Sequence, residues 1–158
     1  KSSAASDVYK RQVGFAVGEP EIISGMAKII SQTTSNLTSV SQYAAIEALT
    51  GDQSSIEEMR KAFEERLNTI YPLLAEVPGF EVIKPQGAFY LFPNVKKAME
   101  IKGYTDVNDF TNAILEEAEV ALVTGAGFGA PENIRLSYAT DLDILKEAVR
   151  RIKAFMEK

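Results

Sequence analysis

Two residue types that carry much of enzyme chemistry are missing from this sequence of 158 residues, which contains no histidine and no cysteine. Their absence excludes a Ser-His-Asp triad, a thiolate nucleophile and an ordinary zinc site, because each needs one of the two. It also excludes disulfides and any sign of an oxidising compartment. Lysine, carboxylates, hydroxyls, tyrosine and arginine remain, so an enzyme built from this set would take its difficult chemistry from a cofactor.

Long apolar runs and an excess of positive charge are missing as well. No stretch approaches about 18 consecutive apolar residues, so no membrane-spanning segment is expected. The net charge of −5 argues against nucleic-acid binding, which needs a clustered basic face. Residues 1–12 lack the apolar centre of a secretory signal, so a cytoplasmic location is the default. An apolar fraction of 46% is ordinary for a globular protein with a real core.

The first fifty residues divide into a leader and a helical region. Residues 1–12 (KSSAASDVYKRQ) are polar and show no period, which is typical of a frayed or foreign leader. Residues 13–17 (VGFAV) are an apolar run that predicts a buried strand. Pro20 stands where a helix would begin. A second helix is predicted to start at a capping box over 39–42 (SVSQ) and to stop at Gly51.

From residue 54 onward, helical and strand patterns alternate. Apolar residues at spacings of three and four predict a long helix over 54–77, with Pro72 kinking it or ending its regular part. The remaining patterns predict strands over 80–83, 88–92, 120–123 and 134–138, with the first two forming a hairpin, and helices over 106–118 and after a Thr140 cap. This order predicts an α/β fold, a small sheet covered by helices on one face.

Two short segments resemble anion sites. Residues 125–129 (GAGFG) have the composition of a phosphate-binding loop, but a strand rather than a helix is expected after them. We therefore interpret these glycines as permitting a tight reversal close to another backbone segment. Residues 33–36 (TTSN) could contact an anion at the start of the next helix, or could simply cap it.

Arg135 is the strongest candidate for a binding residue. Along residues 133–138 (NIRLSY), alternation puts Arg135 and Ser137 on the face opposite Ile134. A guanidinium next to a core needs an anion, and its planar fork matches a carboxylate with two parallel hydrogen bonds. That carboxylate could belong to a substrate or, in a purely structural role, to one of the 22 acidic residues of the chain.

The order of motifs resembles the class I/II aminotransferases, most closely the bacterial aspartate aminotransferase type. The resemblance covers residue 13 to the C-terminus and rests on spacing as well as on four motifs: VGFAVG at 13–18, TSN at 34–36 with QYAA at 42–45, PQGAFY at 85–90 and IRLSYA at 134–139. The motifs are specific as an ordered series rather than singly.

The resemblance implies a fold type I enzyme that depends on pyridoxal 5'-phosphate (PLP) and moves an amino group from an amino acid, here aspartate, to a 2-oxo acid. Residues 13–50 would be a strand of the large domain and interdomain helices, and residues 51–158 the small C-terminal domain. Arg135 would bind the α-carboxylate of the substrate. Ser35 and Asn36 would lie in a loop that approaches the active site of the partner in a homodimer.

The sequence departs from the family at its beginning. The resemblance calls for a Schiff-base lysine at position 4 and a phosphate-binding arginine at position 12, but Ala4 and Gln12 stand there, with Arg11 one place out of register. We therefore expect the leader to be replaced sequence from a truncated or misassembled gene, and the chain alone to be inactive. Two alternatives stay open: a noncatalytic α/β binding module, and a fragment of another PLP enzyme, a decarboxylase or a synthase.

Overall fold

The computed structural model describes residues 12–158, which belong to two compact units. The first unit reaches to Ile56, and the second runs from Glu57 to Lys158. None of the helices in residues 12–158 combines the length and the apolar content that crossing a bilayer requires.

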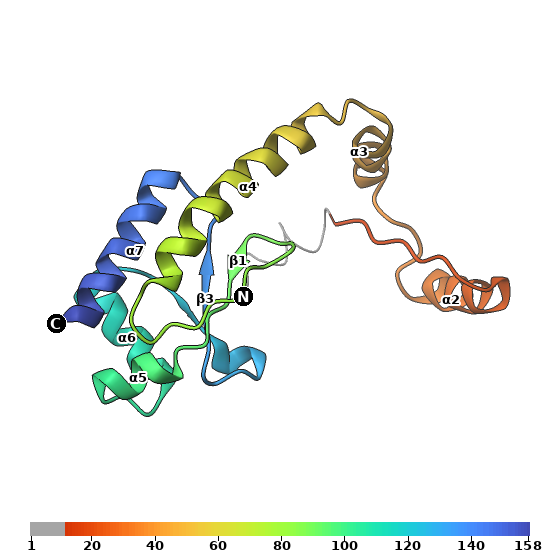
Figure 1. Cartoon of the computed structure of the whole chain (residues 1–158). Coiled ribbons are helices and arrows are strands. Elements are labelled where there is room, and N and C mark those ends of the chain that lie inside the picture. Colours follow the sequence, from red (N-terminus) through yellow and green to blue (C-terminus); the bar gives the residue numbers. More distant parts are fainter. Residues whose placement is uncertain (1–11) are drawn as a thin grey trace. The chain divides into compact units, whose positions relative to one another are not determined.

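The first unit contains α2 (Pro20–Thr33), α3 (Ser39–Thr50) and the first residues of α4 (Ser54–Ala75) (Figure 1). The prediction that Pro20 opens a helix is confirmed. The predicted capping box at 39–42 is wrong, because α3 begins one residue earlier than that motif requires. Thr38 is the N-cap, the Gln42 backbone N–H donates to the Thr38 carbonyl, and the Gln42 side chain donates to the Leu37 carbonyl.

The predicted strand over residues 13–17 is not formed. These residues have no regular secondary structure, and the side chains of Phe15 and Val17 are 85% and 91% exposed. A strand needs the hydrogen-bonding groups of a neighbour, and within residues 12–158 no strand lies beside this segment. An apolar run alone is therefore insufficient for a strand, which also needs a neighbouring strand to pair with.

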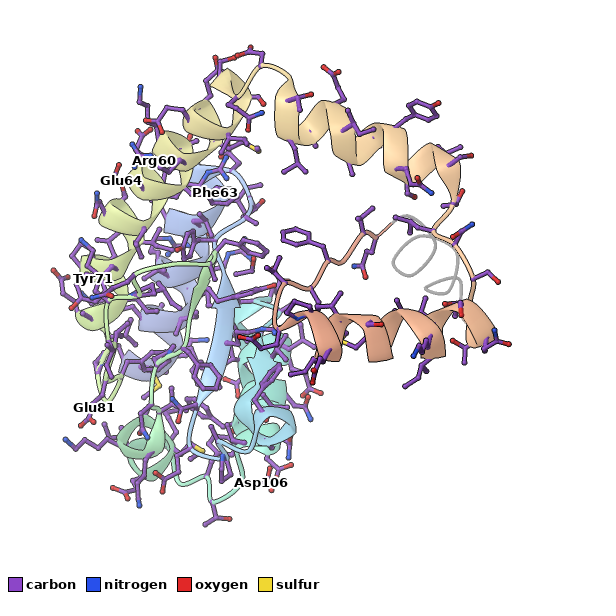
Figure 2. All side chains as sticks on the ribbon, turned by 90° about the vertical axis from the view of Figure 1, so that its right-hand side faces the viewer. Arg60, Phe63, Glu64, Tyr71, Glu81 and Asp106 are labelled. Carbon is purple, nitrogen blue, oxygen red and sulfur yellow. The ribbon has the colours of Figure 1, made fainter. Side chains whose placement is uncertain are left out.

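The second unit is an α/β structure, as expected, with a three-stranded antiparallel sheet in the order β1-β3-β2 (Figure 1). Its elements after α4 are β1 (Tyr90–Leu91), α5 (Lys96–Lys102), α6 (Val107–Ala118), β2 (Val123–Thr124), the 3₁₀ turn η1 (Gly125–Phe128), β3 (Ile134–Ser137) and α7 (Leu142–Glu157). Both views place the sheet along one side of α4 and α7 (Figures 1 and 2).

The core lies entirely in the second unit. Among the described residues, the buried apolar side chains fall between Ile70 and Met156 and form one cluster. Full burial of side chains such as Leu74 and Ile152, both 0% exposed, stabilises the fold by roughly 1.5–3 kcal/mol each. Phe63, labelled on α4 in Figure 2, is partly buried and packs against the core.

The central strand β3 is formed where it was predicted. Ile134, Leu136 and Tyr138 are 1%, 5% and 2% exposed and face the core. Arg135 is half-buried and Ser137 is exposed, which confirms that the two faces of the strand alternate. β3 pairs with β1 on one side, where Leu91 lies beside Leu136, and with β2 on the other, where Val123 lies beside Arg135.

The predicted hairpin of 80–83 with 88–92 is wrong. Tyr90–Leu91 pairs with β3 instead, and the earlier segment makes one isolated bridge, between Glu81 and Asn94. Pairing with β3 places Leu91 beside Leu136, both buried, and within residues 12–158 the segment 80–83 forms no ladder with the other edge of β1. Ala88 has a left-handed backbone (φ 60°) and Ile83 is 87% exposed, so neither belongs to a ladder.

Smaller differences concern element ends. α4 continues through Pro72 and ends at Ala75, and β2 starts three residues later than the strand expected there. The short α5 was not predicted, because seven residues with only Ala98 and Met99 buried leave little periodic signal. α7 is capped by Asp141 rather than by Thr140: the Asp143 backbone N–H donates to the Asp141 carboxylate at 2.9 Å.

Candidate functional site

Arg135 occupies the middle of β3 on the face turned away from the core. Its neighbours Ile134 and Leu136 are buried, which anchors the strand while its own side chain remains half-buried. Among residues 12–158, no Asp or Glu forms an ion pair with Arg135, although ion pairs are numerous on the helices. The structural salt bridge considered from the sequence is therefore not found in this part of the chain.

Two aromatic rings lie against the Arg135 guanidinium instead. Its Cζ is 4.6 Å from the ring centroid of Tyr90 and 4.7 Å from that of Phe128. A guanidinium within about 6 Å of a ring centroid is attracted by the electron-rich face of the ring. Neither ring carries a carboxylate, so within residues 12–158 no ion pair occupies the guanidinium N–H groups, which are donors only.

The register of the sheet brings Tyr90 to Arg135. Tyr90 pairs with Ser137 across the antiparallel β1–β3 ladder, so its side chain lies on the Arg135 face. Arg135 is then the diagonal neighbour of Tyr90, a separation that long and aromatic side chains can bridge. The ring of Tyr90 is itself packed against that of Phe89, with centroids 4.5 Å apart.

The glycine loop brings Phe128 to the same arginine. The loop forms η1, in which the Thr124 side chain accepts a hydrogen bond from the Ala126 backbone N–H at 3.3 Å. The Gly125 backbone N–H donates to the Asn133 carbonyl at 2.7 Å, and a Cβ at Gly125 would collide with that carbonyl. The interpretation of this loop as a tight reversal against another backbone segment is confirmed.

Tyr138 fixes the loop that precedes β1. Its hydroxyl donates to the Ala88 carbonyl at 2.9 Å, and its backbone N–H donates to the Phe89 carbonyl. Burial raises the pKa of the Tyr138 phenol above its ordinary value of 10.0. Tyr138 thereby holds the backbone two residues before Tyr90.

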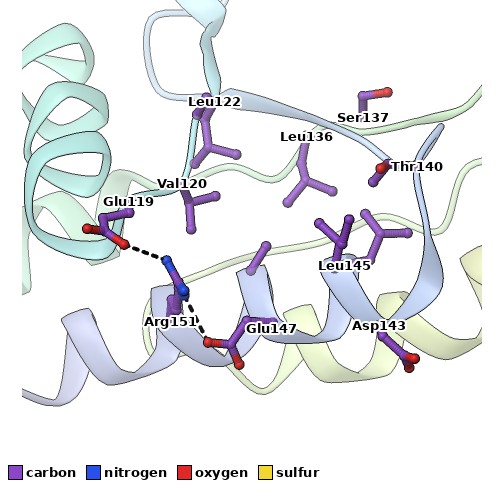
Figure 3. Close-up of a pocket in the computed structure, with 13 residues that line it drawn as sticks. Glu119, Val120, Leu122, Leu136, Ser137, Thr140, Asp143, Leu145, Glu147 and Arg151 are labelled. Atoms are coloured by element: carbon purple, nitrogen blue, oxygen red, sulfur yellow. Dashed lines mark hydrogen bonds and ion pairs between the residues drawn. The ribbon is translucent and has the colours of Figure 1, made fainter.

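A separate cavity of about 570 Å³ lies between α7 and the segment leading into β2 (Figure 3). Arg151 bridges Glu119 (Nη1 to Oε2, 2.8 Å) and Glu147 (Nε to Oε1, 2.9 Å) at its rim. Hydrogen bonds from Arg150 and Arg151 hold the pKa of Glu147 at about 2. Arg135 is not among the residues that line this cavity, so the two features are distinct.

Ser35 and Asn36 lie in the first unit, in the connection between α2 and α3, and both are exposed. Ser35 has a left-handed backbone (φ 61°), and its N–H donates to the Ile30 carbonyl at 2.9 Å, which ends α2. These contacts are those of a helix terminus, and a role for the pair at a partner's active site stays a prediction. Ala4 and Arg11 lie outside the described residues, and Gln12 is exposed.

The described residues do not fit pyridoxal phosphate. A Schiff-base lysine has to be desolvated or placed beside another cation to react as an amine, yet every lysine in residues 12–158 is exposed or half-buried at the surface. Lys84 lines a cavity beside α4 together with Phe63 and Tyr138, and its ammonium donates to Asn68 at 2.8 Å. We therefore assign no chemical step of the cofactor to these residues.

Tyr90 and Phe128 were not predicted from the sequence as partners of Arg135. A signal for Tyr90 existed, because pairing of its strand with β3 puts alternate residues on the arginine's face. The prediction of a hairpin with residues 80–83 obscured that signal. No pattern in the sequence could have found Phe128, since the turn that carries it is irregular.

The chain matches a known family over most of its length. The family model described as aminotransferase class I and II matches residues 8–152. The asparagine–oxo-acid transaminase of Streptococcus mutans is 76% identical over 93% of this chain, and the aspartate aminotransferase of Bacillus subtilis is 56% identical over 93%. The chain spans about 37% of the length of these relatives.

Solved structures give the same result. An aromatic aminotransferase from Pyrococcus horikoshii superposes with a TM-score of 0.81 at 31% identity, covering 95% of this chain and 40% of that one. The aspartate aminotransferase of Rhizobium meliloti superposes with a TM-score of 0.76 at 35% identity, covering 89% of this chain and 36% of that one.

Proposed function

Because this chain belongs to the class I and II aminotransferases, we propose that it is part of a PLP-dependent transaminase and that Arg135 binds the α-carboxylate of the amino acid substrate. The substrates are an amino acid, aspartate or asparagine, and a 2-oxo acid. The names of the relatives support this choice. The full-length protein is a homodimer in the cytoplasm, and its loop at Ser35 and Asn36 approaches the partner's active site.

The observation that carries this proposal is the state of the Arg135 side chain. It is half-buried on a rigid strand, and within residues 12–158 no acidic residue neutralises it. A partly desolvated guanidinium gains most from an anion with two oxygens in one plane, which is the geometry of a carboxylate. In the transaminase, Arg135 therefore binds and orients the substrate.

The most direct experiment transplants this segment into a complete enzyme. In a chimera, residues 13–158 replace the matching segment of the Streptococcus mutans relative, which is 76% identical. Arg135→Gln should raise the KM for the amino acid roughly a hundredfold or more, because a bidentate charge-assisted pair is lost.

Arg66→Gln is the matched control for that experiment. Arg66 is also a half-buried arginine over an aromatic ring, with its Cζ 5.3 Å from the centroid of Phe63, but it is not proposed to bind substrate. The control should leave KM nearly unchanged. An active chimera whose KM does not respond to Arg135→Gln would overturn the assignment.

The 158-residue chain by itself should show no transamination, since Ala4 and Gln12 stand where the family has its lysine and phosphate-binding arginine. Incubation with PLP, aspartate and 2-oxoglutarate should give no glutamate above a buffer control. Turnover would contradict the proposal. Release of carbon dioxide by the active chimera would favour the alternative of a decarboxylase, and formation of a condensation product would favour a synthase.

A noncatalytic binding module is the second candidate, and one observation favours it. On α2, apolar residues at helical spacing are uncovered: Ile22 and Ile29 are 62% and 67% exposed. Uncovered apolar surface of this kind marks an interaction site. Aggregation of the chain, relieved by a specific partner protein, would support this candidate.

A further inference from the structure

The Arg135 guanidinium contacts two aromatic rings and, within residues 12–158, forms no ion pair with an acidic residue. This difference affects how the guanidinium can bind a carboxylate. Starting from the proposed role of Arg135, we propose that Tyr90 and Phe128 are positioning residues, which hold the Arg135 guanidinium in place with its N–H groups free for the substrate carboxylate. The observation is the pair of contacts from Cζ to the ring centroids, 4.6 Å to Tyr90 and 4.7 Å to Phe128.

The choice of partner matters because a carboxylate and a ring hold an arginine in different ways. An Asp or Glu would occupy the N–H fork, and a substrate carboxylate would then have to displace it. A ring attracts the cation without carrying a carboxylate, so no acidic group has to be displaced before a substrate carboxylate binds. Tyr90 and Phe128 therefore restrict the side chain without competing with the ligand.

Both rings are supported by the fold. Tyr90 is fixed by its pairing with Ser137 and by Phe89 beside it. Phe128 is 54% exposed, but the 3₁₀ turn η1 carries it, and its ring meets Phe92 edge-on with centroids 6.2 Å apart. An exposed ring at this place adds little to the core, so a role in holding the arginine accounts for its position better than packing does.

Positioning lowers the entropy that Arg135 must lose when a substrate binds. A free arginine side chain has many rotamers, and ordering it opposes binding. Two rings that restrict it beforehand remove part of that loss. Because the restriction helps the bound substrate and the transition state equally, loss of a ring should appear in KM more than in kcat.

The test uses the active chimera with single substitutions. Phe128→Leu and Tyr90→Leu should each raise the KM for the amino acid by about 3- to 10-fold, the size expected for one cation–π contact. The change in kcat should be smaller. Tyr90→Phe and Phe128→Tyr keep the ring and should restore a KM close to that of the parent chimera.

Tyr71→Leu is the matched control, because it removes a ring from another cation, the Lys84 ammonium 5.9 Å from the Tyr71 centroid. It should leave KM nearly unchanged. A purely structural role of Phe128 would instead lower the amount of active enzyme and leave KM as it was. The proposal is wrong if KM is unchanged in Phe128→Leu while Arg135→Gln raises it.

A second measurement needs no substrate and uses the 158-residue chain. The Nε–Hε signal of Arg135, assigned in ¹⁵N NMR spectra with Arg135→Lys, should be shifted by the nearby rings. Phe128→Leu should move it toward the position of a solvated arginine and speed its exchange with water. An unmoved signal would refute the ring contacts. A failure of Arg135→Gln to change KM, with the signal shifted as expected, would refute the proposed function alone.

Discussion

A single buried phenol connects the central strand with the loop before β1. Tyr138 is 2% exposed, and its hydroxyl donates to the carbonyl of Ala88, whose backbone is left-handed with φ 60°. That carbonyl has no strand partner, so the hydroxyl replaces a ladder hydrogen bond. A side chain here fixes the backbone where the sheet does not.

We predict that Tyr138→Phe lowers the free energy of unfolding by about 1–2 kcal/mol at neutral pH, because the Ala88 carbonyl loses its partner. The raised pKa adds a dependence on pH. The stability that comes from the buried neutral phenol is complete below the unfolded-state pKa, near 10, and is lost as the pH rises through the folded-state pKa.

Urea unfolding between pH 8 and 11 would check this prediction. The difference between the parent chain and Tyr138→Phe should shrink as the pH rises above about 10. Tyr43→Phe is the control, since it removes a hydroxyl from a side chain that is 75% exposed. A difference that stays constant over this range would contradict the assignment.

At the scale of elements, the start of α7 depends on one residue. The helix follows directly on β3 and carries five core side chains: Leu145, Val149, Ile152, Phe155 and Met156. Both Thr140 and Asp141 have the chemistry of an N-cap, and only the backbone conformation decides between them. Asp141 is extended (φ −60°, ψ 143°), and its carboxylate accepts the hydrogen bond from the Asp143 N–H.

Asp141→Ala should therefore lower the free energy of unfolding by about 1 kcal/mol, the usual cost of losing an N-cap. Thr140→Ala, one residue earlier and likewise exposed, should change it by less than about 0.5 kcal/mol. Thermal melts of the two variants under the same conditions would compare them. Equal losses, or a larger loss in Thr140→Ala, would contradict the cap assignment.

The turn η1 gives a second contrast between neighbouring positions. A Cβ at Gly125 would collide with the carbonyls of Ala130 and Asn133, whereas at Gly127 nothing lies within 4 Å of that position. Gly125→Ala should destabilise the fold by roughly 1–3 kcal/mol through overpacking, and should also displace Phe128 from Arg135. Gly127→Ala should be nearly neutral in urea unfolding. A neutral Gly125→Ala would show that the turn can relax.

At the scale of the whole molecule, burial is divided unequally between the two units. The apolar cluster belongs to residues 70–156. In the first unit α2 has no buried residue and α3 buries only Ser41. Helices of this length are marginal in water without packing partners, so the cooperative stability of this chain resides in the second unit.

A chain trimmed to residues 54–158 should unfold cooperatively, with a melting temperature close to that of the whole chain. It should also sediment as a monomer, whereas the whole chain should associate through α2. The double variant Ile22→Lys with Ile29→Lys, which changes two exposed residues on one face of α2, should reduce that association. A trimmed chain that unfolds without a transition, or that associates as strongly as the whole chain, would contradict this division.

Much of the architecture could be predicted from local patterns. Apolar residues at helical spacing predicted α2, α3, α4, α6 and α7, because that spacing can be recognised even when the exact end residues of a helix are misjudged. Alternation along residues 134–138 separated the core face of β3 from the face of Arg135, since two faces are a property of any strand. The ordered motifs also indicated the family, which the match over residues 8–152 bears out.

Other features were decided only by tertiary structure, because they depend on residues far apart in the sequence. Residues 13–17 are apolar enough for a strand, but within residues 12–158 no sheet lies beside them. Tyr90–Leu91 pairs with β3, which is distant in the sequence and places Leu91 beside Leu136, while the nearer residues 80–83 form no ladder with it. The two rings at Arg135 come from a strand 45 positions earlier and a turn seven positions earlier, and no local pattern joins them.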